Sequence, residues 1–453
     1  MFTNKALKNL IVPLVIEQIL VMLVGMVDTM MVSHAGEAAI SGVALVDMID
    51  YLIITVFAAL ATGGAVIVSQ YLGSRQKEQA NTSAGQLITI SFLLSVFVMV
   101  LCLVFYEGIL KLLFGKIEGD VMKACITYFV ITAFSFPFLG IYNASAALFR
   151  SMQKTDTTML VSALMNMINI VGNAIGIFVF KAGVAGVAVP TLISRAIAAV
   201  LITALLFCEK YEVHLRLQTV FSLKKDIVAS ILRIAVPNGL ENGCFALGRV
   251  LVTGIVALFG TAQIAANGVA NSIDQIAVMV VNAINLAMIT VVGQCIGAGE
   301  IKQSTQYTKK LMKISYIATA VLGIGICLSL PLILRFYELS DEAYRYSCIL
   351  IIMHNILAIL LHPTSFNLAN SLRAAGDVRF TMAVGIGSML LFRLGSGMLF
   401  GMILNLGVIG VWMAMGMDWL ARSVAFTFRY KSGKWKTIKI INEKEKNCYV
   451  RKF

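Results

Sequence analysis

The chain repeats itself at a shift of 224 residues. Residues that match at this shift include Pro13 with Pro237, Glu17 with Glu241, Gly36 with Gly260, Gln70 with Gln294, and Gly183 with Gly407. A register kept over so many positions indicates a duplicated gene. Each copy has the length of six membrane helices with their loops, so the chain is predicted to fold into two similar six-helix halves.

The composition of the chain indicates which solvent surrounds it. Hydrophobic residues make up 59% of the sequence and charged residues 13%. This is too little polar surface to cover a water-soluble protein of 453 residues, so we expect the chain in a bilayer. The eight cysteines are scattered singly, without a CxxC pair, so neither a disulfide framework nor a structural metal site is expected.

Twelve apolar stretches are long enough to cross the membrane, which takes about 20 residues in a helix. They run over residues 10–33, 43–68, 86–106, 124–148, 158–180, 184–208, 229–258, 264–293, 311–334, 346–370, 381–403 and 407–428. The sequence therefore predicts an all-α membrane protein with twelve transmembrane helices in two six-helix lobes. The predicted boundaries are an N-terminal lobe (1–208), a cytoplasmic linker (209–227), a C-terminal lobe (228–430) and a basic cytoplasmic tail (431–453).

The distribution of lysine and arginine predicts the orientation in the membrane. These residues concentrate in the tail and in alternate loops, two of which we expect to hold Arg150 and Arg373. By the positive-inside rule this side is cytoplasmic, and the net charge of +13 then reports topology rather than nucleic-acid binding. Both halves enter the membrane in the same direction because each has an even number of helices. The pseudo-twofold axis that relates them should therefore lie along the membrane normal. We expect a multi-pass protein of the cell membrane with both termini in the cytoplasm.

Several strings of the sequence resemble the multidrug and toxic compound extrusion (MATE) transporters. They are GMVDTMMV around Asp28, SQYLG (Ser69 to Gly73), GQCIG (Gly293 to Gly297) and SLRAAGD (Ser371 to Asp377). The resemblance extends over about residues 8 to 430. It implies a V-shaped bundle of two lobes that exports organic cations and other amphipathic compounds in exchange for protons or sodium.

Asp28 is the first candidate for ion coupling, because a carboxylate within an apolar helix is costly without a partner or a water-filled cavity. The position that corresponds to Asp28 at the 224-residue shift is Val252, so only one half of the sequence carries this acid. Asn169 and Asn173 are four residues apart and share one helix face. The resemblance implies that Asp28, Asn169, Asn173 and Thr191 form the cation or proton site. Asn173 stands where some members have aspartate, which favours a proton over sodium. The alternative role for the two asparagines is hydrogen bonding between helices.

The second half carries its own membrane-embedded charges. Arg393 stands at the position of Asn169 and requires an anion. Three acids of this half are candidates: Glu241, Asp274 and Asp418. The arginine either locks the lobe through an internal ion pair or takes part in substrate binding or coupling. Because the acids that some members carry in the second half are missing here, a second cation site is not expected.

Other polar residues lie on predicted helices. Asp47 and Asp50 are three residues apart on one helix face, and Asn271 and Asp274 mirror them. They either border the cleft between the lobes and attract cationic substrates or bridge helix ends. Glu17, the other acid of the first helix, is a further candidate for the cleft or for charge pairing. His354 and His362 lack a third ligand, so we expect packing or a response to pH rather than a metal.

The function predicted is secondary active efflux of organic cations or amphipathic drugs by alternating access, in antiport with H⁺ or Na⁺ and without a cofactor. The partners expected are small cationic substrates and membrane lipid, with no nucleic acid, and the protein is expected to be monomeric. One alternative is a flippase for lipids or polysaccharide precursors. Another is an integral-membrane enzyme, although neither DDxxD nor HExxH occurs in the sequence.

Overall fold

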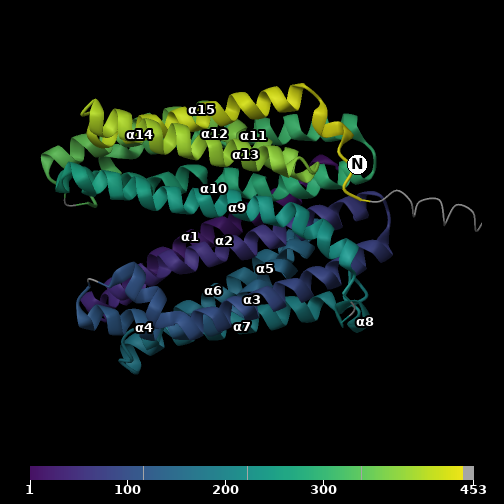
Figure 1. Cartoon of the computed structure of the whole chain (residues 1–453), viewed down its shortest axis with the longest axis horizontal. Coiled ribbons are helices and arrows are strands. Elements are labelled where there is room, and N and C mark those ends of the chain that lie inside the picture. Colours follow the sequence, from purple (N-terminus) through teal and green to yellow (C-terminus); the bar gives the residue numbers. More distant parts are fainter. Residues whose placement is uncertain (116, 222, 338, 442–453) are drawn as a thin grey trace, which may run out of the picture. The chain divides into compact units, whose positions relative to one another are not determined.

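The computed structural model describes residues 1–441 except 116, 222 and 338. The described residues are almost entirely helical and contain no strand. Their contacts divide into two compact units, one made of Phe2–Gly239 and the other of Met1 with the chain from Leu240 onward. Within each unit the long helices run roughly parallel to one another (Figure 1).

The N-terminal unit contains α1 (Asn4–Ser33), α2 (Glu37–Gly73), α3 (Lys77–Phe114), α4 (Gly119–Phe134), α5 (Phe136–Ser151), α6 (Thr155–Ala174), the π-helical turn η1 (Ile175–Val179) and α7 (Ala185–Leu206). The short helix α8 (Leu217–Phe221) lies in the segment that the sequence predicts as a linker. The long helix α9 (Lys225–Val256) follows it and contains the boundary between the two units.

The C-terminal unit continues with η2 (Ala257–Phe259), α10 (Thr261–Gly297), α11 (Ile301–Leu334) and α12 (Asp341–Ala374). The next span is composite and consists of α13 (Val378–Ser388), η3 (Met389–Gly395), α14 (Ser396–Met398) and η4 (Leu399–Ile403), in which η3 and η4 are π-helical. The last elements are α15 (Gly407–Lys431) and η5 (Lys434–Thr437).

Ten helices of the described chain are long and apolar enough to cross a membrane, or eleven if the bent pair α4 and α5 forms one span. The remaining long helix, α15, is not in that group and carries the buried charged residues Asp418 and Arg422. Many large apolar side chains point outward, such as Leu112 and Leu328, which are 85% and 80% exposed. Exposure of such side chains is expected for a surface that faces lipid. The predicted all-α, multi-pass membrane fold is thus confirmed.

The backbone repeats with the same 224-residue register as the sequence. Helix α2 and helix α10 begin and end 224 residues apart, and so do the π turns η1 and η4. Four pairs of described residues with positive φ also repeat at this shift: Gly36 (104°) with Gly260 (94°), Arg75 (59°) with Gly299 (78°), Lys181 (48°) with Asn405 (54°), and Gly183 (56°) with Gly407 (57°). Positive φ is rare for residues other than glycine, so its repetition at Lys181 and Asn405 reflects a shared loop geometry.

The two halves differ at their fourth helix. In the first half α4 and α5 meet at a bend of 48°, and Pro137 lies in the first turn of α5. In the second half α12 continues through Pro363 as a single helix. A side chain occupies the bend, since Arg195 donates from Nη1 to Ser135 Oγ at 2.7 Å.

Two buried ion pairs occupy nearly equivalent positions and correct part of the topology argument. Arg150 Nη2 lies 2.7 Å from Glu17 Oε1, and Arg373 Nη2 lies 2.6 Å from Glu241 Oε2. The prediction that Arg150 and Arg373 are loop cations is wrong, because both belong to the last turn of a helix, α5 and α12 respectively. Each neutralises an acid on the helix that begins its half, so neither contributes a free positive charge to a loop.

Part of the predicted basic tail packs against the bundle. Trp435 is buried and stacks on Tyr430 with ring centroids 4.9 Å apart. Just before the tail, Arg429 in the last turn of α15 donates two hydrogen bonds to Asp377, from Nε at 2.6 Å and from Nη2 at 3.0 Å. Residues 442–453 of the tail lie outside the described residues.

Candidate functional site

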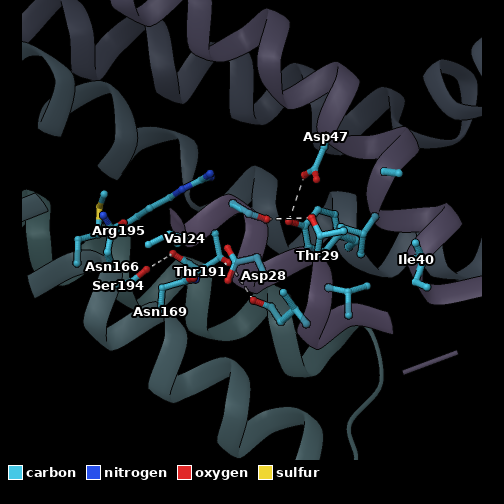
Figure 2. Close-up of a pocket in the computed structure, with 17 residues that line it drawn as sticks. Val24, Asp28, Thr29, Ile40, Asp47, Asn166, Asn169, Thr191, Ser194 and Arg195 are labelled. Atoms are coloured by element: carbon cyan, nitrogen blue, oxygen red, sulfur yellow. Dashed lines mark hydrogen bonds between the residues drawn. The ribbon is translucent and has the colours of Figure 1, made fainter. Parts of the chain in front are cut away.

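A cavity of about 270 Å³ lies inside the N-terminal unit, between α1, α2, α4, α6 and α7. Figure 2 shows its lining, with Asp28 beside Asn169 and Thr191. Its polar lining residues are Asp28, Thr29, Asp47, Tyr128, Asn166, Asn169, Thr191, Ser194 and Arg195. Apolar residues such as Val24, Ile40 and Met165 complete the wall, so the cavity offers both charge and hydrophobic surface.

Asp28 is held by the two asparagines of α6. Asn173 Nδ2 donates to Asp28 Oδ1 at 2.8 Å. The side-chain amide of Asn169 lies next to the same carboxylate, and one of its polar atoms is 3.1 Å from both Asp28 oxygens. The opposite polar atom of this amide lies 3.0 Å from Thr191 Oγ1. The structure therefore brings together all four residues that the sequence and the resemblance group as an ion site.

The amide of Asn169 has two useful orientations. With its oxygen toward Asp28, that oxygen accepts from Asn173 Nδ2 at 3.3 Å and the nitrogen donates to Thr191 Oγ1. With its nitrogen toward Asp28, the nitrogen donates to the carboxylate and the oxygen accepts from Thr191. An ionised carboxylate only accepts hydrogen bonds, whereas a protonated one also donates. The first orientation therefore suits a protonated Asp28 and the second an ionised one.

Local structure explains how these residues reach the carboxylate. Asn169 and Asn173 are one helical turn apart near the end of α6, so both amides project from one face. The π turn η1 follows directly, and there Gly176 packs against Gly186 of α7. A Cβ atom on Gly176 would lie 2.2 Å from the Gly186 carbonyl oxygen, so the two backbones are in contact. This contact brings Thr191 of α7 within hydrogen-bond distance of Asn169.

The two acids of α2 lie in different surroundings. Asp47 lines the cavity and accepts a hydrogen bond from the Tyr128 hydroxyl at 3.4 Å. Asp50 is 4% exposed, is not among the lining residues, and its Oδ1 has no hydrogen-bond partner among the described residues. Of the two acids predicted to border a cleft, Asp47 thus lies on a cavity wall and Asp50 is buried inside the helix bundle.

Arg195 is a lining residue that the site prediction omitted. Among the described residues around the cavity it is the one cation, and it shares the wall with Asp28 and Asp47. Figure 2 shows it on the α7 side of the cavity, near Asn166 and Ser194. An arginine inside a predicted membrane helix is a signal that can be read from the sequence. Its proximity to two acids on α1 and α2 is not.

In the C-terminal unit the anion beside Arg393 is Asp418. Arg393 Nη1 lies 3.7 Å from Asp418 Oδ2, and the same carboxylate accepts from Arg422 Nε at 2.9 Å. Glu241 instead neutralises Arg373 and lies 3.9 Å from Arg422 Nη1. Arg422, which was not among the predicted site residues, therefore connects the two acids.

The remaining candidate acid and the two histidines form a separate group. Asp274 Oδ1 lies 2.5 Å from His354 Nε2. His362 stacks on Phe366 with ring centroids 4.3 Å apart and contacts the Trp419 ring edge to face. Both histidines are buried among aromatic rings, and no group of three or more metal-binding side chains occurs in the described part of the chain.

Comparison with known proteins identifies the family. The family model MatE matches residues 13–175 and again residues 237–399, two segments related by the same 224-residue shift. The chain is 30% identical to the uncharacterized transporter YisQ of Bacillus subtilis, with 93% of each chain covered. It is 25% identical to the probable multidrug resistance protein NorM of Thermotoga maritima, covering 95% of this chain and 93% of NorM.

Solved structures agree on the fold. A multidrug resistance MATE family transporter in an outward-facing conformation superimposes with a TM-score of 0.89 at 20% identity, covering 96% of this chain and 97% of that one. A MATE structure in a bent conformation gives a TM-score of 0.87, with 96% of each chain covered. The chain therefore belongs to the MATE family of membrane transporters, which confirms the predicted family and excludes the alternative of a membrane enzyme.

Proposed function

We propose that this transporter exports small organic cations across the bacterial cell membrane by alternating access, in exchange for protons that bind Asp28. The observation that carries the proposal is the contact of Asp28 with Asn173 and Asn169 on the wall of a cavity that also holds Asp47. Several relatives are named probable multidrug resistance proteins, which supports drug-like substrates. MATE transporters require no cofactor.

In the substrate-binding state Asp28 is ionised. Asn173 and the rotated amide of Asn169 then donate to its two oxygens, and the cavity carries two negative charges against the one positive charge of Arg195. This excess of negative charge attracts an organic cation. Tyr128 and Met165 in the wall add an aromatic ring and a polarisable side chain that suit apolar parts of a substrate.

Binding of a proton to Asp28 reverses the hydrogen bonds around its carboxyl group and lowers the negative charge of the cavity. A protonated Asp28 donates to the Asn169 oxygen, and the amide nitrogen of Asn169 then donates to Thr191 on α7. Rotation of the Asn169 amide on α6 thus couples the protonation state of Asp28 on α1 to the hydrogen bond that Thr191 on α7 makes. Loss of one negative charge weakens the attraction for the cation, so proton entry favours its release.

A proton fits this site better than sodium. The polar atom that Asn173 presents to Asp28 is a nitrogen, which cannot ligate a metal ion. Sodium would need several oxygen atoms turned toward one point, and Asp28 is the one carboxylate of the four-residue group. The site as arranged supplies hydrogen-bond donors for a carboxylate that changes its charge.

Efflux from proteoliposomes tests the proposal. Ethidium transport is measured with a proton gradient or a sodium gradient imposed separately, for the unchanged protein and for Asp28→Asn. The matched control is Glu37→Gln, which removes an exposed acid at the start of α2. We expect proton-driven uphill efflux in the unchanged protein and in the control, and none in Asp28→Asn. Efflux driven by sodium alone, or uphill efflux by Asp28→Asn, would contradict proton coupling at this residue.

A further inference from the structure

The C-terminal unit contains a second, smaller cavity of about 50 Å³. The described residues that line it are Arg249, Val252, Thr253, Asn267, Asn271, Arg393, Val411, Trp412 and Met415. Shifted back by 224 residues, most of these positions fall on the lining of the first cavity: Gly25, Asp28, Thr29, Val43, Asp47, Asn169, Val187 and Thr191. The second cavity is therefore the counterpart of the first in the repeated fold.

The two counterparts have opposite charge. The acids of the first cavity, Asp28 and Asp47, are replaced by the neutral residues Val252 and Asn271. Arginines occur at two positions where the first cavity has uncharged residues, Arg249 in place of Gly25 and Arg393 in place of Asn169. The first lining thus carries two acids and Arg195, whereas the described lining of the second carries two arginines and no acid.

The surrounding unit does not neutralise these arginines fully. In the network next to the cavity, Glu241 and Asp418 are shared by three arginines, namely Arg373, Arg422 and Arg393. Arg393 is the most distant of them from its carboxylate, at 3.7 Å, and its buried Nε has no hydrogen-bond partner among the described residues.

Arg249 increases this excess of positive charge. It forms no ion pair with any described residue, and Asp274, an acid of the same unit that feels its charge, is paired with His354. Arg249 is partly buried, and a positive charge withdrawn from water without a counterion is costly. An anion in the cavity would remove that cost.

The shape and polarity of the cavity indicate the kind of anion. Arginine presents a planar set of N–H donors that matches a carboxylate with two parallel hydrogen bonds. The other donors in the lining are engaged: Thr253 Oγ1 donates to the Arg249 carbonyl at 3.0 Å and Asn271 Nδ2 to the Asn267 carbonyl at 2.8 Å. The Trp412 N–H donates to Asn267 Oδ1 at 2.9 Å, so the arginines are the groups left to hold an anion. A volume of about 50 Å³ has room for a carboxylate group, so the rest of a larger molecule would lie outside.

We propose that this second cavity binds the carboxylate group of an organic anion or zwitterion through Arg249 and Arg393. The site goes beyond cation export, because it gives the C-terminal unit a place for the negatively charged end of a molecule, whereas Asp28 belongs to the N-terminal unit. It does not depend on proton coupling, and its occupation can be measured at equilibrium without any gradient.

Equilibrium binding of benzoate to the purified full-length protein tests the assignment. The perturbing variant is Arg249→Met, which removes the arginine that has no ion pair to lose. The matched control is Arg233→Met, since Arg233 is exposed on the same helix and lies outside the cavity. We expect benzoate to bind the unchanged protein and the control alike, and Arg249→Met to bind it at least tenfold more weakly. Benzylamine, a cation of similar shape, should not compete.

A second readout separates loss of the site from loss of the fold. Benzoate should raise the thermal unfolding temperature of the unchanged protein and of Arg233→Met but not that of Arg249→Met. Without benzoate, Arg249→Met should unfold at the same temperature as the unchanged protein or higher, because it lacks an uncompensated charge. The proposal is overturned if benzoate fails to bind, if Arg249→Met binds it as tightly as the control, or if chloride displaces it at equal concentration, which would identify a halide site.

Discussion

Replacing Arg150 by methionine should lower the free energy of unfolding by about 3 to 5 kcal/mol, the range for breaking a buried ion pair from one side. The size of this loss follows from the Glu17 carboxylate, which remains buried without its partner. The Glu17 side chain is 5% exposed and, among the described residues, would keep the Thr158 hydroxyl, which donates to its Oε2 at 3.1 Å. Glu17→Gln should cost less, because the Arg150 side chain is 16% exposed and lies in the last turn of α5, where it can reach water.

SDS-induced unfolding of the purified protein in detergent measures these differences. The double variant Glu17→Gln with Arg150→Met should recover most of the loss, because no charge is then left unpaired.

An exposed pair in the same unit provides the control. Lys111 and Glu107 lie 2.9 Å apart on α3 with side chains 67% and 55% exposed. Replacing Lys111 by methionine should leave the free energy of unfolding nearly unchanged, because water screens such a pair. The reasoning is refuted if Arg150→Met costs no more than this control, or if the double variant is no more stable than Arg150→Met alone.

Two further variants probe the first cavity and the helix contact beside it. Arg195→Gln should tighten binding of the organic cation tetraphenylphosphonium about fivefold, because roughly 1 kcal/mol of electrostatic repulsion is removed. The exposed control Arg233→Gln should leave the Kd unchanged. Equal Kd values for the two variants would show that Arg195 does not oppose cation binding. Gly176→Ala should lower stability by about 1 to 3 kcal/mol through overpacking against Gly186. Gly108→Ala on α3, where a Cβ meets open space, should be neutral or slightly stabilising. Thermal unfolding of the two glycine variants distinguishes these outcomes, and equal stability would contradict the close backbone contact.

Hydropathy and the repeat predict most of the fold, because both are properties of the chain itself. Apolar length defines the membrane helices whatever their neighbours. The group around Asp28 could also be predicted, since two asparagines one turn apart share a face and the family resemblance supplies Thr191. These relations lie within one helix or one motif, so they can be read from residue spacing in the sequence.

Relations between distant helices could not be predicted in the same way. Arg150 was placed in a loop because it follows the last apolar residue of its stretch, yet its partner is 133 residues away on α1. At the bend between α4 and α5, Ser135 accepts a hydrogen bond from Arg195, 60 residues further along the chain. The π turns leave no mark on apolar periodicity that a window of helix length detects. Each of these features is decided by packing across the bundle rather than by local composition.

The matching turns η1 and η4 place the features of this transporter in order of age. A π turn holds one residue more than an α turn, and two separate insertions at the same register would be a coincidence. A single insertion in the ancestral half-length protein explains both. Differences between the halves, such as Asp28, Arg249 and the additional π turn η3, then arose by gain in one half or loss from the other after the duplication. The ancestor would have assembled from two identical chains with identical cavities, and fusion into one chain released each cavity to acquire its own charge.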